Sequence, residues 1–199
     1  KSDLMRGREF LMKDLYSFSR NQKEHDDFYE KAAEAYLRVY ERLGLGDITF
    51  RTFASGGIFS QFSDEFQTLS HVGEDTIFVD ENKRVAVNKE VYNDEVLNQL
   101  GLKKEELVEK KAVEVGNIFS LGSKYSDALD VYFTDENGQQ QSIIMGCYGI
   151  GISRLMGLLA EHFADEKGLV WPESVAPAKV YLASIGNDEK VIKSADELY

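Results

Sequence analysis

A glycine-rich junction between a strand and a helix constrains the fold of this chain more than any other sequence feature. Residues Gly146–Arg154 read GCYGIGISR and connect an apolar, strand-like stretch to a helical pattern over roughly Ile152–Phe163. Glycine lets a backbone approach a ligand closely, and the first turn of a helix offers N–H donors to an anion. Arg154 would add a planar cation suited to phosphate. The spacing favours an anion-binding turn, although a tight connection with a surface arginine explains this motif alone equally well.

A second candidate site lies near the start of the chain, where Arg6–Phe10 (RGREF) leads into a strand predicted over Phe10–Phe18. Two arginines beside an aromatic ring could hold a polyphosphate and stack on an adenine, whereas a solvated charged turn is the simpler alternative. Alternation places Met12, Asp14 and Tyr16 on one face of the strand. A carboxylate among apolar neighbours is costly unless it is paired or lies near a ligand cation.

The order of the remaining elements predicts an α+β fold, with several antiparallel strands and a helix packed across them. A long amphipathic helix, capped by Ser19 or Asn21, is expected to end near Leu43. The turn Glu136-Asn137-Gly138 predicts a hairpin, and Lys103–Lys111 is expected to form a short solvated helix. Further strands are expected over Ile48–Phe53, Thr76–Val79, Ala112–Phe119, Leu129–Thr134, Gln140–Cys147 and Lys179–Ile185, and a last helix over Asp188–Tyr199.

The composition limits which kinds of partner the chain is expected to bind. The formal net charge of −12 argues against broad attraction to phosphate backbones, but an RNA partner held by a local basic strip stays open. No apolar run reaches the roughly 20 residues that span a bilayer, so no membrane partner is expected. The single cysteine, Cys147, cannot form an internal disulfide, which fits a reducing, cytoplasmic location.

The histidines show no spacing typical of a catalytic or metal-binding cluster. His25 and His162 fall in amphipathic helices and are expected to be solvated or to cap those helices, whereas His71 is expected to be structural. No histidine motif lies near Cys147, so a catalytic thiol is not expected. The first residues, Lys1–Leu4, lack an initiator methionine and an apolar signal stretch, which indicates an internal cut.

Together the two motifs resemble the second and third signature motifs of class II aminoacyl-tRNA synthetases: Arg-x-x-x-Phe before a strand, and Gly-x-Gly-x-x-Arg at a helix start. In that family these motifs bind ATP on an antiparallel sheet. Further collinear blocks are similar to bacterial-type prolyl-tRNA synthetases and cover nearly the whole chain apart from residues 81–111. These blocks are Arg8–Phe18, Gly56-Gly57 with Glu65-Phe66, Gly73–Asp75, Glu114–Phe119, Leu121–Ser126, Met145–Arg154 and Trp171–Pro177.

The resemblance implies an ATP site. Arg6 would contact the outer phosphates, Phe10 would stack on the adenine, and Arg154 would lie on the opposite side of the triphosphate. Gly149 and Gly151 would line the same site. Arg6 and Arg154 are thus the catalytic candidates, with ATP as substrate and Mg²⁺ sharing the phosphate charge. No side chain is assigned to the metal.

The same resemblance implies a proline pocket. It would be lined by Met12, Asp14, Tyr16, Cys147 and Gly149, with Cys147 at its floor. Asp14 would pair with the secondary ammonium, while the apolar side chains shape a slot for the ring. Alternatively, Met12 and Tyr16 would simply pack in the core, and Cys147 would be a small buried apolar residue. Glu65 and Asn117 are further candidates close to the substrate.

The implied activity is ligation of proline to its tRNA through prolyl-adenylate, in a protein that forms a homodimer when complete. The leading Arg-x-Glu of the second motif and the dimer-forming first motif would precede this sequence, so the chain alone is expected to be inactive. The alternative is a non-catalytic, synthetase-like paralogue that binds amino acid or tRNA for regulation. Asp64 and Asn117, at positions where the family usually has His, motivate that alternative. A threonyl enzyme is a weaker rival because no zinc ligands appear.

Four segments follow from the resemblance. Residues 1–80 would form the catalytic core from the second half of motif 2, and residues 112–176 the core that includes motif 3. Residues 81–111 would be a short charged insertion in place of an editing domain, and residues 177–199 the start of an α/β anticodon-binding domain. Because the insertion is far too short for an editing domain, no editing in cis is expected.

Overall fold

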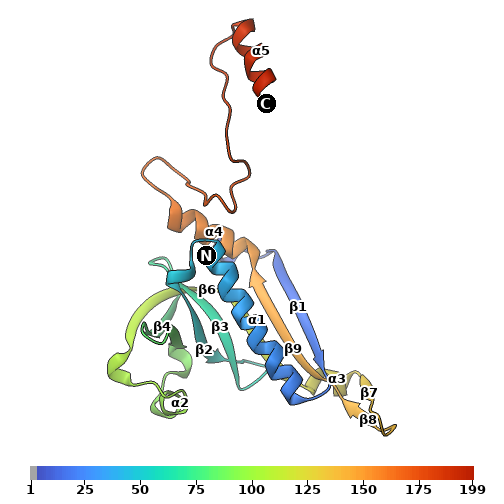
Figure 1. Cartoon of the computed structure of the whole chain (residues 1–199). Coiled ribbons are helices and arrows are strands. Elements are labelled where there is room, and N and C mark those ends of the chain that lie inside the picture. The colour runs from blue at the N-terminus through green and yellow to red at the C-terminus, as the bar shows by residue number, and fades with distance from the viewer. Residues whose placement is uncertain (1–3) are drawn as a thin grey trace.

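The computed structural model of the chain describes residues 4–199. Figure 1 shows a large sheet crossed by the long helix α1, with α4 at one end of the sheet and a C-terminal segment that extends away from it. The strands are β1 Met12–Ser19, β2 Thr49–Ser55, β3 Phe62–Leu69, β4 Asp75–Asp80, β5 Val85–Asn88, β6 Val108–Gly122, β7 Tyr132–Thr134, β8 Gln140–Ser142 and β9 Ile144–Gly151. The α-helices are α1 Gln22–Arg42, α2 Asp94–Gln99, α3 Lys124–Ala128, α4 Ile152–Phe163 and α5 Glu189–Leu198. Short 3-10 helices are η1 Leu4–Arg6, η2 Gly46–Ile48, η3 Lys89–Val91 and η4 Lys104–Glu106.

Seven strands form the main sheet in the order β1-β9-β6-β3-β2-β5-β4, and β4 pairs in addition with β6. All of these pairings are antiparallel except the one between β2 and β5. The fifteen-residue β6 belongs to both halves of the sheet, because its first residues pair with β4 and its later residues pair with β3 and β9. Strands β6, β3, β2, β5 and β4 thereby close into a ring. The predicted α+β class, with its mainly antiparallel sheet, is confirmed.

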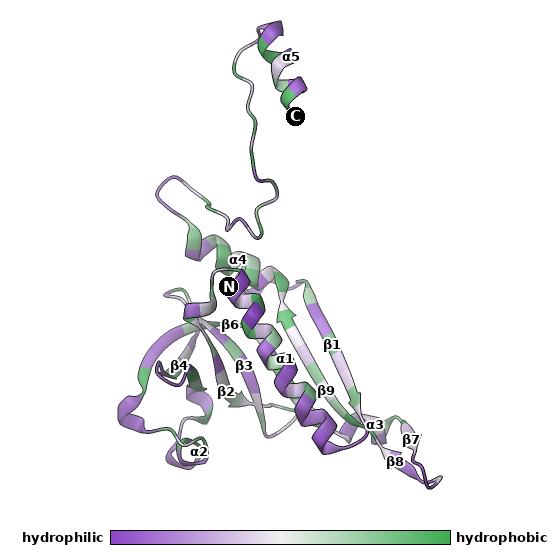
Figure 2. Ribbon diagram, viewed as in Figure 1, coloured by the Kyte–Doolittle hydropathy of each residue, from purple (hydrophilic) through white to green (hydrophobic). Residues whose placement is uncertain are grey.

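Helix α1 covers one face of the sheet and supplies much of the core. Asn21 caps it, because the side-chain Oδ1 accepts the backbone N–H of Glu24 at 2.9 Å, whereas Ser19 ends β1. Tyr36 and Tyr40 pack against Phe66 of β3, in a cluster that also includes residues of β6, β9 and α4. In Figure 2 the side of α1 turned to the viewer is largely hydrophilic, as expected for a helix with one apolar stripe.

The segment 81–111 is folded, and the helix predicted over Lys103–Lys111 is wrong. Only Lys104–Glu106 form a 3-10 turn, and β6 begins at Val108. Charged side chains suit a solvated helix, but here Glu109, Lys110 and Lys111 belong to a strand whose backbone pairs with β4. Near it a small separate core forms from Val87, Val96, Leu97 and Leu102.

Three further expectations are corrected. The hairpin strand predicted over Gln140–Cys147 is interrupted at Ile143, whose carbonyl accepts the Ser126 hydroxyl at 2.5 Å. No strand forms over Lys179–Ile185, because these residues have no partner strand among residues 4–199 to take their backbone hydrogen bonds. The helix beyond them, α5, does form, with Asp188 as its N-cap and no buried residue.

Two histidines also differ from expectation. His25 is buried, since the first turn of α1 holds it against Tyr29 with ring centroids 5.9 Å apart, and burial lowers its pKa. His71 is exposed, and its Nε2 lies 3.4 Å from Glu161 of α4. His162 lies exposed near the end of α4, as expected. Among residues 4–199, none of the helices is both long and apolar enough to cross a membrane.

Gly116 of β6 allows α1 to approach the sheet. A Cβ at this position would lie 2.5 Å from the Tyr40 hydroxyl and 2.9 Å from the carbonyl oxygen of Gly149. We expect Gly116→Ala to lower the free energy of unfolding by about 1–3 kcal/mol, because the added methyl overpacks this contact. Urea denaturation of the two proteins measures the effect.

Tyr40→Phe is the matched background for this test. The Tyr40 hydroxyl is buried and has no hydrogen-bond partner among the described residues, so its removal alone is expected to be nearly neutral. Gly116→Ala should cost less in the Tyr40→Phe background than in the wild type. An equal cost in both backgrounds would show that the helix approach does not explain the glycine.

Candidate active site

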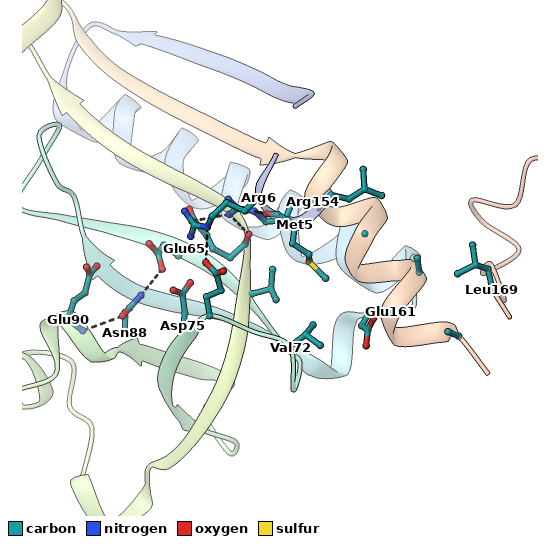
Figure 3. Close-up of a pocket in the computed structure, with 17 residues that line it drawn as sticks. Met5, Arg6, Glu65, Val72, Asp75, Asn88, Glu90, Arg154, Glu161 and Leu169 are labelled. Atoms are coloured by element: carbon teal, nitrogen blue, oxygen red, sulfur yellow. Dashed lines mark hydrogen bonds and ion pairs between the residues drawn. The ribbon is translucent and has the colours of Figure 1, made fainter. Parts of the chain in front are cut away.

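Two adjoining cavities lie where η1, the start of α4 and the strands β6 and β9 meet. The larger has a volume of about 770 Å³ and the smaller about 360 Å³. Both are lined by Arg6, Glu114 and Arg154. Figure 3 shows Arg6 and Arg154 close together, with Glu65, Asp75 and other polar side chains of the sheet toward the other side of the larger cavity.

The sheet register brings four candidate residues into one row across four strands. Asp14 of β1 pairs with Gly149 of β9, Gly149 pairs with Asn117 of β6, and Asn117 pairs with Glu65 of β3. Directly paired residues point to the same face of a sheet. The row therefore places two carboxylates and an amide on one face, although they are far apart in sequence.

Neighbouring rows carry the other predicted pocket residues. Tyr16 pairs with Cys147, which pairs in turn with Phe119, and Met12 pairs with Gly151. Lys13, between Met12 and Asp14, donates to the Tyr36 hydroxyl of α1, so these positions share the face of Asp14 and lie opposite α1. The alternation predicted from sequence is confirmed, and the candidate residues form one continuous area of the sheet.

Gly149 leaves a hollow in the middle of this area. A Cβ there would lie 3.0 Å from the Met12 methyl carbon and 3.5 Å from Asn117 Oδ1. Any side chain at this position would fill the space between β1 and β6. A side chain at this position would thus press on the end of Met12 on the site face, while the backbone angle of Gly149 is an ordinary one.

Arg154 stands where the two cavities meet and is held by three interactions. Its Nε donates to the Met5 carbonyl at 3.0 Å, and its Nη1 donates to the Glu114 carbonyl at 2.8 Å. The same Nη1 lies 3.3 Å from the Glu114 carboxylate. Burial raises the pKa of Glu114, while Arg154 opposes this by favouring the ionised form. The guanidinium is thus fixed in position before any ligand binds.

The start of α4 is less open to an anion than its sequence suggests. The Ile152 N–H donates to the Leu11 carbonyl at 2.9 Å, and the Ser153 hydroxyl accepts the Leu11 N–H at 3.0 Å. These bonds extend the β1–β9 pairing into the first turn of the helix. The N-cap, Gly151, provides no side-chain hydrogen bond.

Arg6 lines the larger cavity and contacts the turn between β3 and β4. Its Nε donates to Glu74 at 2.7 Å, and its side chain is 59% exposed, so a ligand can reach it. Phe10 lines the smaller cavity beside Met12 and is 53% exposed. An exposed aromatic ring next to two arginines is consistent with the expected adenine contact.

The far end of the larger cavity is acidic. Glu65 accepts hydrogen bonds from Gln67 at 2.8 Å and Asn88 at 3.1 Å, and Gln67 also donates to Asp75 at 2.9 Å. Burial, together with the charges of Glu114 and Asp75, raises the pKa of Glu65 to about 7. These side chains create a negative potential opposite the two arginines.

The structure does not bring every predicted residue into the cavities. Phe10, Met12, Asn117, Gly149 and Gly151 line the smaller cavity, and Glu65 lines the larger. By contrast, Asp14, Tyr16 and Cys147 lie on the same face of the sheet but do not line either cavity. Asp14 is exposed on this face, so the expected cost of burying its carboxylate does not arise. Burial raises the pKa of the Cys147 thiol, which favours the protonated form.

Several residues of the site were not singled out from sequence. Glu114, Glu74, Asp75 and Asn88 line the cavity, and Gln67 bridges two of its carboxylates. Glu74, Asp75 and Glu114 fall in blocks that resemble the family, which gave no role to single side chains, whereas Gln67 and Asn88 had no such signal. Among the described residues, no group of three or more His, Cys, Asp or Glu is arranged to hold a metal ion.

The fold and the site define a class of protein. The chain belongs to the family described as the tRNA synthetase class II core domain (G, H, P, S and T), which residues 1–163 match. Among similar structures is a prolyl-tRNA synthetase from Cryptosporidium parvum complexed with L-proline and AMP, with a TM-score of 0.63. The two chains are 20% identical, and the match covers 99% of this chain and 34% of that one, so it shows the fold alone.

Curated relatives carry a more particular name. The chain is 37% identical over 207 residues to a proline--tRNA ligase from Wolbachia sp. subsp. Drosophila simulans (strain wRi). It is also 37% identical over 210 residues to a proline--tRNA ligase from Rickettsia akari (strain Hartford). Each match covers 98% of this chain but 48% and 49% of the relatives, so the chain spans about half their length.

The raised pKa of Glu65 predicts a pH-dependent stability. Since the folded state binds this proton more tightly than the unfolded chain, its contribution is present below about pH 4.5 and is lost as pH rises to about 7. Glu65→Gln should therefore unfold less readily than wild type at pH 8, by on the order of 1–2 kcal/mol, and nearly equally at pH 4. Denaturant titrations at both pH values measure this.

Glu136→Gln provides the control for the change in net charge, because Glu136 lies exposed in the turn between β7 and β8. This variant is expected to leave the difference in the free energy of unfolding between pH 8 and pH 4 unchanged. A Glu65→Gln variant that behaves like Glu136→Gln would contradict the burial of an ionised Glu65 in the cavity.

Proposed function

We propose that this chain is part of the catalytic core of a proline–tRNA ligase. Such an enzyme converts proline and ATP to prolyl-adenylate and pyrophosphate, and then transfers the prolyl group to tRNA. The observation that carries the proposal is the row Asp14–Gly149–Asn117. Gly149 and Asn117 of this row line the same cavity as Arg6 and Arg154. An amino-acid site and a phosphate site thus share one face of the sheet. The similarity to proline–tRNA ligases over 98% of the chain supports the choice of amino acid.

The geometry suits attack of a carboxylate on the α-phosphate of ATP. In this reaction the proline carboxylate oxygen forms a bond to the α-phosphorus, and pyrophosphate leaves. Little proton transfer is needed, so the protein acts by aligning the two reactants and by balancing charge. With its ammonium at Asp14, the amino acid would direct its carboxylate toward the arginines. Phe10, at the edge of the smaller cavity, would hold the adenine.

The larger cavity would suit a magnesium ion that is coordinated by both protein carboxylates and substrate phosphates. Mg²⁺ usually binds through one or two carboxylates together with phosphate oxygens and water. Glu65 and Glu114 line the same cavity and repel each other, which contributes to the raised pKa of Glu65. These two residues would hold the ion, and a bound Mg²⁺ would neutralise phosphate charge. Glu65 would lose its proton on binding.

One of the two departures from the family pattern lies outside this site. Asp64 sits next to Glu65 on β3 and therefore points to the other face of the sheet, where it pairs with Arg51 at 2.7 Å. Arg51 also pairs with Glu30 of α1 at 2.7 Å. The residue at position 64 thus helps to hold α1 on the sheet. This weakens the argument for a non-catalytic paralogue, because only Asn117 remains as a change within the site.

The proposal extends to partners and domains. The tRNA for proline would accept the prolyl group. The complete protein would form a homodimer, and it would be located in the cytoplasm. Residues 177–199 would begin an anticodon-binding domain. Residues 81–111, which fold around their own small core, would leave the protein without editing in cis. Hydrolysis of alanyl-tRNA by the protein that contains this chain would contradict the last statement.

Proline-dependent ATP–pyrophosphate exchange, measured on the protein that contains this chain, tests the function. We expect Arg154→Ala to lower kcat/KM for ATP at least about 100-fold, because a fixed cation at the triphosphate is lost. Its melting temperature should stay within a few degrees of wild type, since the side chain lies partly exposed at the cavity. Unchanged exchange kinetics would refute the assignment of Arg154 to the triphosphate.

Arg38→Ala is the matched control for this variant. It also removes one arginine, but from the exposed side of α1, where Arg38 lies 3.8 Å from Glu34. We expect exchange by this variant to equal that of the wild type. Absence of exchange with proline in the wild type itself, together with retained proline binding, would favour the regulatory paralogue.

A further inference from the structure

We propose that Gly157 of α4 is a positioning residue for the nucleotide. It forms a notch in the helix that seats η1, and the seating of η1 sets where Arg6 stands beside the larger cavity. The inference rests on the proposed function, since it names what holds one of the two arginines of that site in place. Gly157 would act through η1 and not through a contact of its own with the reacting atoms.

Gly157 is an unfavourable residue for the place it occupies. It lies in the middle of α4 (Ile152–Phe163), and its backbone angle is an ordinary one. Glycine in the interior of a helix is less favourable than alanine, because it loses more backbone freedom on folding. The helix itself therefore gives no reason for this glycine, and the reason lies in what packs against it.

η1 packs directly on this position. A Cβ at Gly157 would lie 3.1 Å from Leu4 Cβ, 3.7 Å from the Leu4 carbonyl carbon and 3.8 Å from Met5 Cγ. Two carbon atoms in favourable contact are about 3.5–4.0 Å apart, so the first distance is too short for an undisturbed contact. A side chain at this position would press η1 away from the helix.

Arg154 shares this face of α4. It precedes Gly157 by three residues, so the two positions are neighbours on the helix surface. Arg154 Nε donates to the Met5 carbonyl at 3.0 Å, and the Met5 side chain packs against the core cluster that includes Tyr36 and Tyr40. The notch therefore lets η1 come close enough for its backbone to reach the arginine.

The two arginines depend on the notch to different degrees. Arg154 has two further contacts, with the Glu114 carbonyl at 2.8 Å and with the Glu114 carboxylate at 3.3 Å. Arg6 belongs to η1 itself, and its mostly exposed side chain contacts Glu74 at 2.7 Å. A displaced η1 would thus move Arg6 and leave Arg154 largely in place. We therefore expect the loss to fall on the phosphates nearest Arg6.

Gly157→Leu and Gly157→Ala test the inference in the protein that contains this chain. In proline-dependent pyrophosphate exchange, leucine should raise KM for ATP about tenfold and alanine by a smaller factor, with KM for proline within about twofold of wild type. The second probe is a prolyl-adenylate analogue with a sulfamoyl link, which lacks the two outer phosphates. Its inhibition constant should stay within about twofold of the wild-type value in both variants.

Leu4→Gly provides the rescue, because it removes the Cβ atom that lies nearest to the notch. The increase in KM for ATP caused by Gly157→Ala should be smaller in the Leu4→Gly background than in the wild type. Equal increases in both backgrounds would overturn the proposal, since Gly157 would then act through another contact. Equal weakening of ATP and of the analogue would also overturn it, because the whole adenylate site would then be affected.

Met156→Leu is the matched control. It places a leucine at the neighbouring position of α4, where the side chain is exposed and lines neither cavity. Both KM values should equal those of the wild type. A raised KM for ATP in this control would overturn the proposal, since any change in the helix would then have the same effect.

Failure of the proposed function gives a different result. In that case the wild-type protein itself would show no exchange with proline, and the inference would fall with it. A wild type that exchanges with proline, combined with Gly157 variants whose KM for ATP is unchanged, would overturn the inference alone.

Discussion

The register of β9 between β1 and β6 is the constraint on which the site depends. β9 carries glycines on both faces, and the pairing decides which of them opens toward the ligand side. With Gly149 opposite both Asp14 and Asn117, a polar group stands on each side of a gap. A slip of one residue would exchange the faces of the whole strand and bring Tyr148, now buried beneath α1, to the site face. The packing of α1 on the opposite face therefore helps to hold the site together.

Electrostatics divides the site into two regions. Arg6 and Arg154 stand on the side of η1 and α4, while Glu65, Asp75 and Glu114 belong to the sheet. Glu114 connects the regions, because it binds Arg154 with one oxygen and Asn117 with the other. Under the proposed function, a ligand at the phosphate side would therefore influence Asn117, because the Glu114 carboxylate contacts both Arg154 and Asn117.

Local patterns gave the sequence-based prediction its successes. The helix predicted over Ile152–Phe163 has those limits in the structure, and Asn21 is the cap of α1 because its short side chain satisfies a free N–H of the first turn. Alternation alone placed Met12, Asp14 and Tyr16 on one face. Each of these features depends on residues close in sequence, which is why it could be inferred without the fold.

The failures have a common physical origin in tertiary contacts. β3 was missed because its buried face carries polar residues, such as Thr68, whose hydroxyl lies 2.8 Å from that of Thr49 on β2. The charges of Lys103–Lys111 indicated a solvated helix, yet pairing with β4 made the residues from Val108 onward a strand. His25 looked like a surface residue of an amphipathic helix. The acidic end of the cavity could not be foreseen because its side chains come from different strands.

The length of β6 has a consequence for how the protein opens. This strand is shared by the closed ring and by the face that bears the site, so neither region can lose its structure while the other keeps all of its pairings. The amide hydrogens of β6 should therefore exchange with solvent only in the largest opening of the domain, as one cooperative unit. A synthetase-like site built this way has little freedom to loosen locally, and its adaptability must come from η1 and the side chains around the cavity.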